Sequence, residues 1–361
     1  MPASTSAPIP PAVIDPSTTL MFAEASEGAD AVRRFLDQNH FALVELAEHL
    51  RANPPRSVIT CARGSSDHAA TYGKYLIETM VGIPTSSAAL SVSSIYASPV
   101  VAENALCIAI SQSGRSPDLV TAVEAHKRAG AYVVVLVNDD TSPLASLADT
   151  LLPLEARTER SVAATKSYIA SLAGLAAIIA AWTGDNTLKT ALDALPEQLD
   201  KAFALDWSAA MPALIGARNL FVIGRGYSLG VAQEAALKLK ETCALHAEAF
   251  SSAEVRHGPM AIVGEGFPVL AFATVDAAGD GVREVCADFA ERGATVLLAD
   301  ASGPMETPAG KVVHLPSLTT APALEPIVLI QSFYRMANAL SVACGLNPDT
   351  PPHLNKVTRT V

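Results

Sequence analysis

The chain has 361 residues, enough for two domains of ordinary size or for one duplicated unit. Half of the residues are apolar and only 5% are aromatic, a composition typical of closely packed α/β layers. A formal net charge of −11 excludes an extended nucleic-acid surface, which needs a basic stripe, but not a local pocket for a small anion.

The five cysteines are widely scattered and form neither a disulfide framework nor a metal-ligand spacing, so we expect a reducing, cytoplasmic location. Residues 1–18 are rich in Pro and Ser and lack an apolar core, and the first basic residue is Arg33. This segment predicts a disordered leader rather than a signal peptide. The longest apolar run, residues 168–182, is shorter than the ~20 residues that cross a bilayer and predicts a buried core helix.

Residues 19–50 have helical spacing, and Asn53-Pro54-Pro55 ends the pattern. Short apolar runs then predict strands that alternate with helices, at residues 57–60, 85–88, 105–110 and 132–137. Strands that are apolar on both faces predict a parallel sheet covered on both sides.

A second unit repeats this plan after a boundary at residues 184–186 and an amphipathic helix at 188–203. Strands are expected at residues 220–223, 269–273, 295–299 and 312–315, and helices at 229–245, 281–292 and 326–343. The sequence SVITCARGSS at residues 57–66 parallels NLFVIGRGYS at 219–228. We therefore predict two related αβα sandwiches, at residues 19–186 and 187–345, followed by a polar tail at 346–361.

Residues 221–260 combine an apolar strand, a glycine turn and a helix. On that helix Glu234, Lys238 and Glu241 are spaced by four and three residues and share one face. This spacing alone favours an ordinary solvated ladder of salt bridges. The turn Gly224-Arg225-Gly226 is a candidate anion site, because a helix N-terminus follows it.

Ligands of open parallel sheets bind beyond the carboxyl ends of the strands. In the first unit these ends carry Gly64-Ser65-Ser66 and residues 111–116, SQSGRS. Hydroxyls and backbone N–H groups at a helix N-terminus form a phosphate cradle, although an ordinary polar loop has the same composition. A third loop, residues 158–166, either adds donors or only caps the next helix. No Walker A loop, dinucleotide fingerprint, zinc pattern or Gly-x-Ser-x-Gly elbow occurs in the sequence, so we expect no nucleotide, cofactor or metal.

From residue 19 onward the chain resembles a known family, the isomerase half of glucosamine-6-phosphate synthase, which is a tandem of two sugar-isomerase (SIS) domains. The resemblance is carried by ordered motifs: Gly64-Ser65-Ser66, SQSG at 111–114, VAATK at 162–166, ALKLKE at 236–241, HAE at 246–248, EVRHGP at 254–259 and LNKVT at 354–358. It implies two flavodoxin- or Rossmann-like αβα sandwiches with parallel sheets.

The resemblance also implies roles for individual residues. Glu241 corresponds to the base that moves a proton between C1 and C2 of the open-chain sugar, with Lys238 beside it. His257 corresponds to the histidine that opens the sugar ring and that comes from the neighbouring subunit, which implies a homodimer. Lys356 corresponds to the tail lysine that contacts the sugar carbonyl and can form an imine with it. The substrate phosphate would be held by Ser65, Ser66, Ser111, Gln112, Ser113 and Ser116, and the sugar by Val162 and Ala163.

Two features depart from the synthases. Their N-terminal glutaminase domain has a terminal cysteine nucleophile, whereas this chain begins Met1-Pro2 and has no cysteine before Cys61. Arg115 stands where the synthases have an acidic residue, and the Arg-Ser-Pro form resembles stand-alone members, including type II glucosamine-6-phosphate deaminases. We therefore predict an enzyme that converts glucosamine 6-phosphate and water to fructose 6-phosphate and ammonia.

Two alternatives remain open from the sequence. One is a phosphosugar isomerase or sugar-amine deglycase that acts on another substrate. The other is a non-catalytic phosphosugar sensor, because SIS domains also serve as ligand-binding modules in regulators. Neither a helix-turn-helix nor a basic DNA-binding segment occurs in the sequence, and a sensor would not need Glu241, His257 and Lys356 together.

Overall fold

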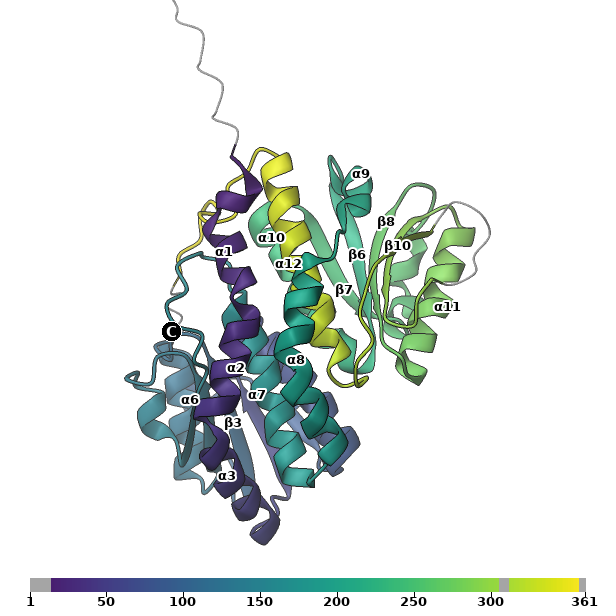
Figure 1. Ribbon diagram of the computed structural model, residues 1–361. Helices are drawn as coiled ribbons and strands as arrows, with labels where there is room; N and C mark the ends of the chain where they lie inside the picture. Colours follow the sequence, from purple (N-terminus) through teal and green to yellow (C-terminus); the bar gives the residue numbers. More distant parts are fainter. Residues whose placement is uncertain (1–13, 305–311, 357–361) are drawn as a thin grey trace, which may run out of the picture.

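The computed structural model describes residues 14–304 and 312–356 and contains two five-stranded parallel sheets flanked by helices (Figure 1). The first sheet has the strand order β2-β1-β3-β4-β5. Its strands are β1 (Ser57–Cys61), β2 (Thr85–Ser87), β3 (Ala105–Ser111), β4 (Tyr132–Val137) and β5 (Thr150–Pro153). The predicted fold class, two tandem αβα units with parallel sheets, is confirmed.

The second sheet has the order β10-β9-β8-β6-β7, which is the same topology read from the other edge. Its strands are β6 (Asn219–Gly224), β7 (His246–Ser251), β8 (Pro268–Ala273), β9 (Thr295–Asp300) and β10 (Val312–Leu315). In both sheets the chain starts next to the centre, moves to one edge and then crosses back. This common path explains the repeat seen between residues 57–66 and 219–228.

The apolar strand patterns place β3 and β8 at the middle of their sheets. Every residue of β3 and of β8 is buried, because helices cover both faces. β5 and β7 were not among the predicted strands. Both are edge strands with partly exposed residues, so their sequences lack the continuous apolar run that marked the central ones.

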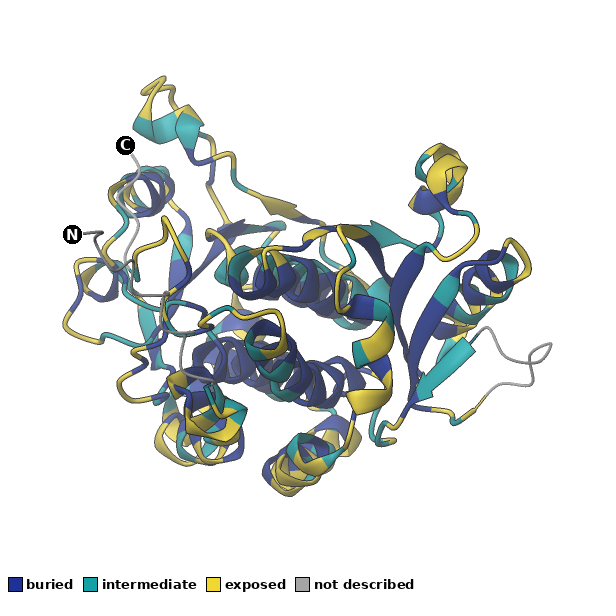
Figure 2. Cartoon of the chain, turned by 90° about the horizontal axis from the view of Figure 1, so that it is seen from above, coloured by how far each residue is buried: buried dark blue, intermediate teal, exposed yellow. Residues whose placement is uncertain are grey.

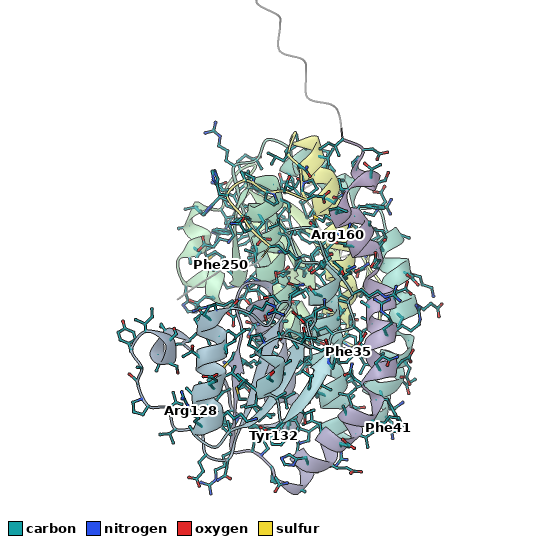
Figure 3. All side chains as sticks on the ribbon, turned by 90° about the vertical axis from the view of Figure 1, so that its left-hand side faces the viewer. Phe35, Phe41, Arg128, Tyr132, Arg160 and Phe250 are labelled. Carbon is teal, nitrogen blue, oxygen red and sulfur yellow. The ribbon has the colours of Figure 1, made fainter. Side chains whose placement is uncertain are left out.

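The helical stretch predicted at residues 19–50 is divided into three helices. The helices are α1 (Leu20–Ser26), α2 (Gly28–Gln38) and α3 (His40–Ala52). Glu27 separates α1 from α2, and Asn39 separates α2 from α3. The 3-10 turn η1 (Pro16–Thr18) precedes α1, and the Thr19 side chain caps the N-terminus of α1. Of the segment predicted as a leader, residues 14–18 belong to the described structure and residues 1–13 lie outside it. Phe35 of α2 is buried, whereas Phe41 of α3 is 80% exposed (Figure 3).

The remaining helices of the first unit are α4 (Ser65–Leu76), the π-helical turn η2 (Ile77–Val81), α5 (Ser91–Ser94), α6 (Pro117–Arg128), the 3-10 turn η3 (Ala145–Leu147) and α7 (Lys166–Thr183). The apolar helix α7 is long enough to cross a membrane by length and composition, yet 89% of it is buried inside the protein. It is the predicted core helix, and α2, α3 and α4 pack against it. Figure 2 shows that the buried residues gather on the helices and strands in the interior, whereas the outer helices and loops are exposed.

The second unit contains α8 (Asn186–Ala204), the 3-10 turn η4 (Ser208–Ala210), α9 (Met211–Leu214), the 3-10 turn η5 (Gly226–Ser228), α10 (Leu229–Cys243), the 3-10 turns η6 (Glu254–His257) and η7 (Pro259–Ile262), α11 (Ala277–Glu291) and α12 (Glu325–Ala343). Helix α1 lies beside α12 in Figure 1, and Thr19 Oγ1 donates to Asn338 Oδ1 over 2.7 Å. The N-terminal helix therefore packs against the second unit.

The two units meet where α10 crosses α4. A Cβ atom on Gly230 would lie 2.5 Å from the carbonyl oxygen of His68, so only glycine permits this close approach. The Tyr168 hydroxyl donates to the Gly230 carbonyl over 3.2 Å and ties the crossing to α7. The crossing brings the helix that carries Lys238 and Glu241 against the first unit.

Candidate functional site

The first sheet has a topological switch point between β1 and β3, because the chain leaves these neighbouring strands in opposite directions. β1 leads into the loop before α4, and β3 leads into residues 112–116 before α6. The two serine-rich loops thus lie side by side at the carboxyl edge of the sheet, which is where open α/β sheets bind ligands.

A pocket of about 360 Å³ opens at this edge. It brings together residues that are far apart in the sequence: the two serine loops, the end of α10 and the C-terminal tail. The lining residues are Arg63, Gly64, Ser65, Ser66, Ile110, Ser111, Gln112, Ser113, Ser116, Leu119, Val162, Ala164, Glu241, Leu354, Asn355 and Lys356.

The loop after β3 has a fixed shape. The Ser111 hydroxyl accepts a hydrogen bond from the Gly114 N–H over 2.9 Å. Gly114 has a φ of +63°, and a Cβ there would lie 2.1 Å from Ser142 Oγ, so this turn requires glycine. Ser116 occupies the N-cap position of α6, yet its side chain makes no capping bond within the described residues. Its hydroxyl can therefore bind a ligand.

Arg115 lies outside the pocket lining. Its guanidinium contacts Asp139 over 2.7 Å, and the Arg115 side chain is 49% exposed. The pocket's own cations are Arg63, which contacts Asp118 over 2.8 Å, and Lys356. The pocket combines hydroxyls, the N-termini of α4 and α6 and positive charge, which suits an anion.

Lys238 and Glu241 do not belong to a solvated ladder. Lys238 is 1% exposed, forms an ion pair with Glu241 and lies 3.4 Å from the fully buried Glu234. Burial alone would lower the pKa of Lys238, but the charges of Glu234 and Glu241 outweigh burial and raise it. Lys238 is therefore a cation that lies behind Glu241, while Glu241 itself, 22% exposed, faces the pocket.

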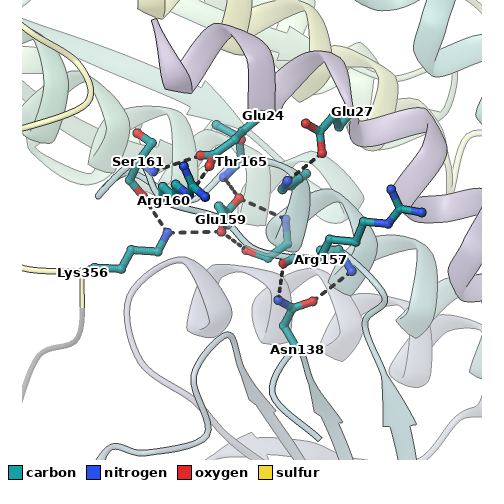
Figure 4. A network of polar contacts seen from close by, with 12 residues as sticks. Glu24, Glu27, Asn138, Arg157, Glu159, Arg160, Ser161, Thr165 and Lys356 are labelled. Atoms are coloured by element: carbon teal, nitrogen blue, oxygen red, sulfur yellow. Dashed lines mark hydrogen bonds and ion pairs between the residues drawn. The ribbon is translucent and has the colours of Figure 1, made fainter.

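The C-terminal tail is fastened to the first unit at several points. The carboxylate of Asp349 accepts from the backbone N–H groups of Leu20 and Met21, each over 2.8 Å. The Asp349 carbonyl accepts from the Val162 N–H over 3.3 Å. Lys356 donates to the Ser161 carbonyl over 2.7 Å and contacts Glu159 over 3.3 Å (Figure 4). These contacts hold the described part of the tail beside the pocket.

Three predicted site residues lie outside the lining. His257 is exposed at the end of η6 in the second unit. Ala163 is fully buried between Val162 and Ala164, which both line the pocket. Lys238 reaches the pocket only through Glu241. The candidate anion turn Gly224-Arg225-Gly226 also lies elsewhere, and its Arg225 N–H already donates to Ser228 Oγ over 3.0 Å.

Sequence reasoning missed several contributors. Arg63, Ala164, Leu354 and Asn355 line the pocket, and each lies within two residues of a predicted site residue. The sequence indicated for Glu159 only a place in a loop that leads into a helix. Its contact with Lys356 could not be predicted, because the two residues are 197 positions apart. His68 contacts Glu234 over 3.0 Å from the other unit, and no local pattern marks such a pair.

Comparison with known proteins identifies the family. The SIS domain family matches residues 53–181 and 213–310. A glutamine–fructose-6-phosphate aminotransferase (isomerizing) of Symbiobacterium thermophilum is 33% identical over 315 residues, which are 83% of this chain and 51% of that protein. The enzyme of the same name from Aeropyrum pernix is 34% identical over 307 residues, with coverages of 81% and 49%. The chain thus spans about half the length of the curated relatives it matches.

Solved structures share the whole arrangement. A candidate phosphosugar isomerase from Silicibacter pomeroyi DSS-3 is 42% identical, with a TM-score of 0.86 over 92% of this chain and 100% of that one. The C-terminal domain of glucosamine-fructose-6-phosphate aminotransferase from Francisella tularensis (TM-score 0.82, 92% and 98% covered) is 23% identical and shares the fold. Glucosamine-6-phosphate deaminase from Thermotoga maritima (TM-score 0.74, 95% and 100% covered) is 22% identical and does so too. The chain belongs to the SIS domain family and carries two copies of the domain.

Proposed function

We propose that the chain is a metal-independent enzyme that converts glucosamine 6-phosphate and water to fructose 6-phosphate and ammonia. One observation carries the proposal: a single pocket contains the serine loops of β1 and β3, the carboxylate of Glu241 and the ammonium of Lys356. The curated relatives are named as isomerizing aminotransferases of fructose 6-phosphate, which supports a hexose 6-phosphate as the ligand.

The phosphate would bind at the serine loops. Ser65 and Ser66 open α4, and Ser116 precedes α6, so backbone N–H groups and the positive ends of two helix dipoles face the same point. The side chains proposed to hold it are Ser65, Ser66, Ser111, Gln112, Ser113 and Ser116. Val162 and Ala163 would contact the sugar chain, Ala163 through its backbone because its side chain is buried.

The proposed proton transfer uses Glu241. In the open-chain sugar its carboxylate removes the proton from C2, and the electron pair forms a C1–C2 double bond while negative charge develops on O1. Lys356 stabilises that charge, and Glu241 returns the proton to C1. As C1 takes up the proton, the nitrogen lone pair forms the C2=N bond, and one nitrogen proton passes to O1, which becomes the C1 hydroxyl. Water then adds to C2 of the imine, and ammonia leaves as the C2 carbonyl forms.

Ring opening moves a proton from the anomeric hydroxyl to the ring oxygen, and we assign this step to His257. In one chain His257 is exposed and away from the pocket. The proposal therefore requires a homodimer in which the histidine of one copy completes the pocket of the other. Lys238 would keep Glu241 in place and supply charge behind it.

A second candidate in the same chemical class is aldose–ketose isomerisation, or deglycation, of another sugar phosphate. It is favoured by the 42% identity with the Silicibacter protein described as a candidate phosphosugar isomerase. The proton transfer by Glu241 is the same. In isomerisation the C2 substituent is a hydroxyl and no nitrogen is lost, whereas deglycation releases an amine in place of ammonia when water hydrolyses the imine.

The test is incubation of the purified protein with glucosamine 6-phosphate and assay of both products. Equimolar fructose 6-phosphate and ammonia support the deaminase. Ketose without ammonia from a panel of hexose 6-phosphates supports the isomerase instead. Tight sugar-phosphate binding without turnover, unchanged in Glu241→Gln, overturns both in favour of a non-catalytic sensor.

A further inference from the structure

Glu159 lies beside the pocket and makes several polar contacts that the catalytic scheme does not use. It lies in the loop before α7, and its side chain is fully buried. One carboxylate oxygen accepts from the backbone N–H groups of Thr165, over 2.9 Å, and Ser167, over 3.3 Å. The other accepts from the Ser167 hydroxyl over 2.6 Å and from Lys356 over 3.3 Å.

The same loop is held from its other side by α1. The carboxylate of Glu24 accepts from the Arg160 N–H and, over 3.1 Å, from the Ser161 N–H (Figure 4). With its amide fixed in this way, Ser161 presents its carbonyl oxygen to Lys356 over 2.7 Å. Figure 4 shows the Lys356 ammonium between this carbonyl and the Glu159 carboxylate.

The pKa values of the two carboxyl groups in this cluster, Glu159 and Glu24, are shifted in opposite directions. Burial alone would raise the pKa of Glu159, but the charge of Lys356 and the hydrogen bonds from Ser167 and Thr165 outweigh burial and lower it. Burial raises the pKa of Glu24, in spite of its hydrogen bonds to the loop. A lowered pKa keeps Glu159 ionised, and a buried anion needs a fixed cation beside it.

We propose that Glu159 is a positioning residue that holds the Lys356 ammonium, and with it the tail, in place at the pocket. This inference rests on the proposed function for its catalytic consequence, since Lys356 is the group assigned to the sugar oxygen. Its structural content, that one buried carboxylate fixes one tail lysine, is independent of the substrate.

The first test measures how fast Lys356 reacts with an amine-acylating reagent, read by peptide mass spectrometry, with the exposed Lys201 as internal reference. In Glu159→Gln, Lys356 should react about tenfold faster, the effect expected from loss of one charge-assisted hydrogen bond. The matched control is Glu27→Gln, which removes a carboxylate that contacts Lys166 at the start of α7 over 2.7 Å and should leave the Lys356 rate within about twofold.

A merely structural Glu159 gives a different pattern. If it only caps α7, Glu159→Gln accelerates hydrogen exchange at Thr165 and Ser167 but leaves Lys356 labelling unchanged, and that outcome overturns the proposal. If Glu159→Gln does not fold, Lys356→Met takes its place. Exchange in residues 346–355 should then rise about tenfold while the start of α7 stays protected, and unchanged exchange in the tail overturns the proposal.

Steady-state kinetics test separately whether Glu159 affects catalysis. If the wild-type protein deaminates glucosamine 6-phosphate, Glu159→Gln should lower kcat about tenfold with KM nearly unchanged, because the serine loops still hold the phosphate. Failure of the wild-type protein to turn over refutes the proposed function and leaves the labelling result to decide on Glu159. If Lys356 is labelled faster in Glu159→Gln but kcat is unchanged, Glu159 positions Lys356 without affecting catalysis.

Discussion

His68 Nδ1 lies 3.0 Å from Glu234 Oε2 and joins α4 of the first unit to α10 of the second. The other oxygen of Glu234 lies 3.4 Å from Lys238 Nζ and accepts from the Tyr334 hydroxyl over 3.3 Å. Lys238 in turn pairs with Glu241, the carboxylate in the pocket. A chain of polar contacts therefore connects the unit boundary to the candidate base.

Glu234→Gln tests this chain. Because Glu234 is fully buried, its removal leaves Lys238 with one carboxylate partner fewer in a site that water does not reach. We expect the free energy of unfolding to fall by about 3 kcal/mol, the scale for breaking a buried ion pair. Denaturant unfolding measures it, and Glu197→Gln, which removes an exposed pair with Lys201, should change little. Equal stability of the two variants would show that Glu234 is dispensable.

Glu241→Gln should separate catalysis from binding. The amide keeps the shape of the side chain but cannot accept the C2 proton, so kcat should fall by about 10²- to 10⁴-fold. Isothermal titration with fructose 6-phosphate should still show binding, since the serine loops are untouched. Glu248→Gln, an exposed position on β7, is the control and should retain activity. A Glu241→Gln protein with substantial kcat would remove this residue from the proton transfer.

The fold followed from the sequence wherever burial was complete. β3, β4 and β8 are buried nearly throughout, so each is a continuous apolar run with a turn at its end. The edge strands β5 and β7 carry mixed sequences, and their pairing with β4 and β6 depends on sheet order, which local patterns do not encode. The division of residues 19–50 into three helices depends on packing against α7 and α12.

The site was predictable in its parts and not in its assembly. The serine loops stand beside strand ends, and the motif with Glu241 stands on a helix, so both could be located from the sequence. Whether Lys238 faces solvent or a buried Glu234 depends on the α4–α10 crossing, which brings distant residues together. For the same reason the contact of Glu159 with Lys356 had no local signal.

Ser116→Ala should weaken binding of the phosphate without loss of stability. The Ser116 hydroxyl makes no capping bond within the described residues, so its removal costs only the contact with the ligand. KM for a hexose 6-phosphate should rise about tenfold, as for one hydrogen bond to a charged group. Ser111→Ala is the comparison, because the bond from Ser111 Oγ to the Gly114 N–H shapes the loop and its loss should also lower Tm. Equal KM for Ser116→Ala and wild type would place the phosphate elsewhere.

Glu325 at the start of α12 should make stability depend on pH. Burial raises its pKa from 4.5 to about 7, although the Val275 N–H donates to it over 2.7 Å, and Asp276 and Asp300 add to the rise. The folded state thus holds this proton more tightly than the unfolded chain. The stabilisation is complete below about pH 4.5 and is lost as the pH rises through about 7.

The variant Glu325→Gln stays neutral at every pH, so its stability should fall less than that of the wild type between about pH 5 and pH 8. Arg283, which pairs with Asp300 over 3.0 Å, is unchanged in both proteins and cancels in the comparison. Thermal unfolding across this pH range measures the difference. Glu291→Gln, an exposed position at the end of α11, should follow the wild-type curve. Parallel curves for Glu325→Gln and wild type would mean that Glu325 titrates normally.

Mixing two inactive variants tests whether His257 acts across a dimer. Glu241→Gln and His257→Ala should each be nearly inactive alone, the first for lack of a base and the second for lack of ring opening. In a mixed dimer one pocket combines both defects, and the other combines the intact Glu241 of one copy with the intact His257 of its partner. After unfolding and refolding together in equal amounts, random pairing should restore about a quarter of wild-type activity. If His257 served its own chain, no pocket in the mixed dimer would be complete and mixing would restore no activity. In that case, assaying His257→Ala with the open-chain form of the substrate would decide whether ring opening is the role of His257.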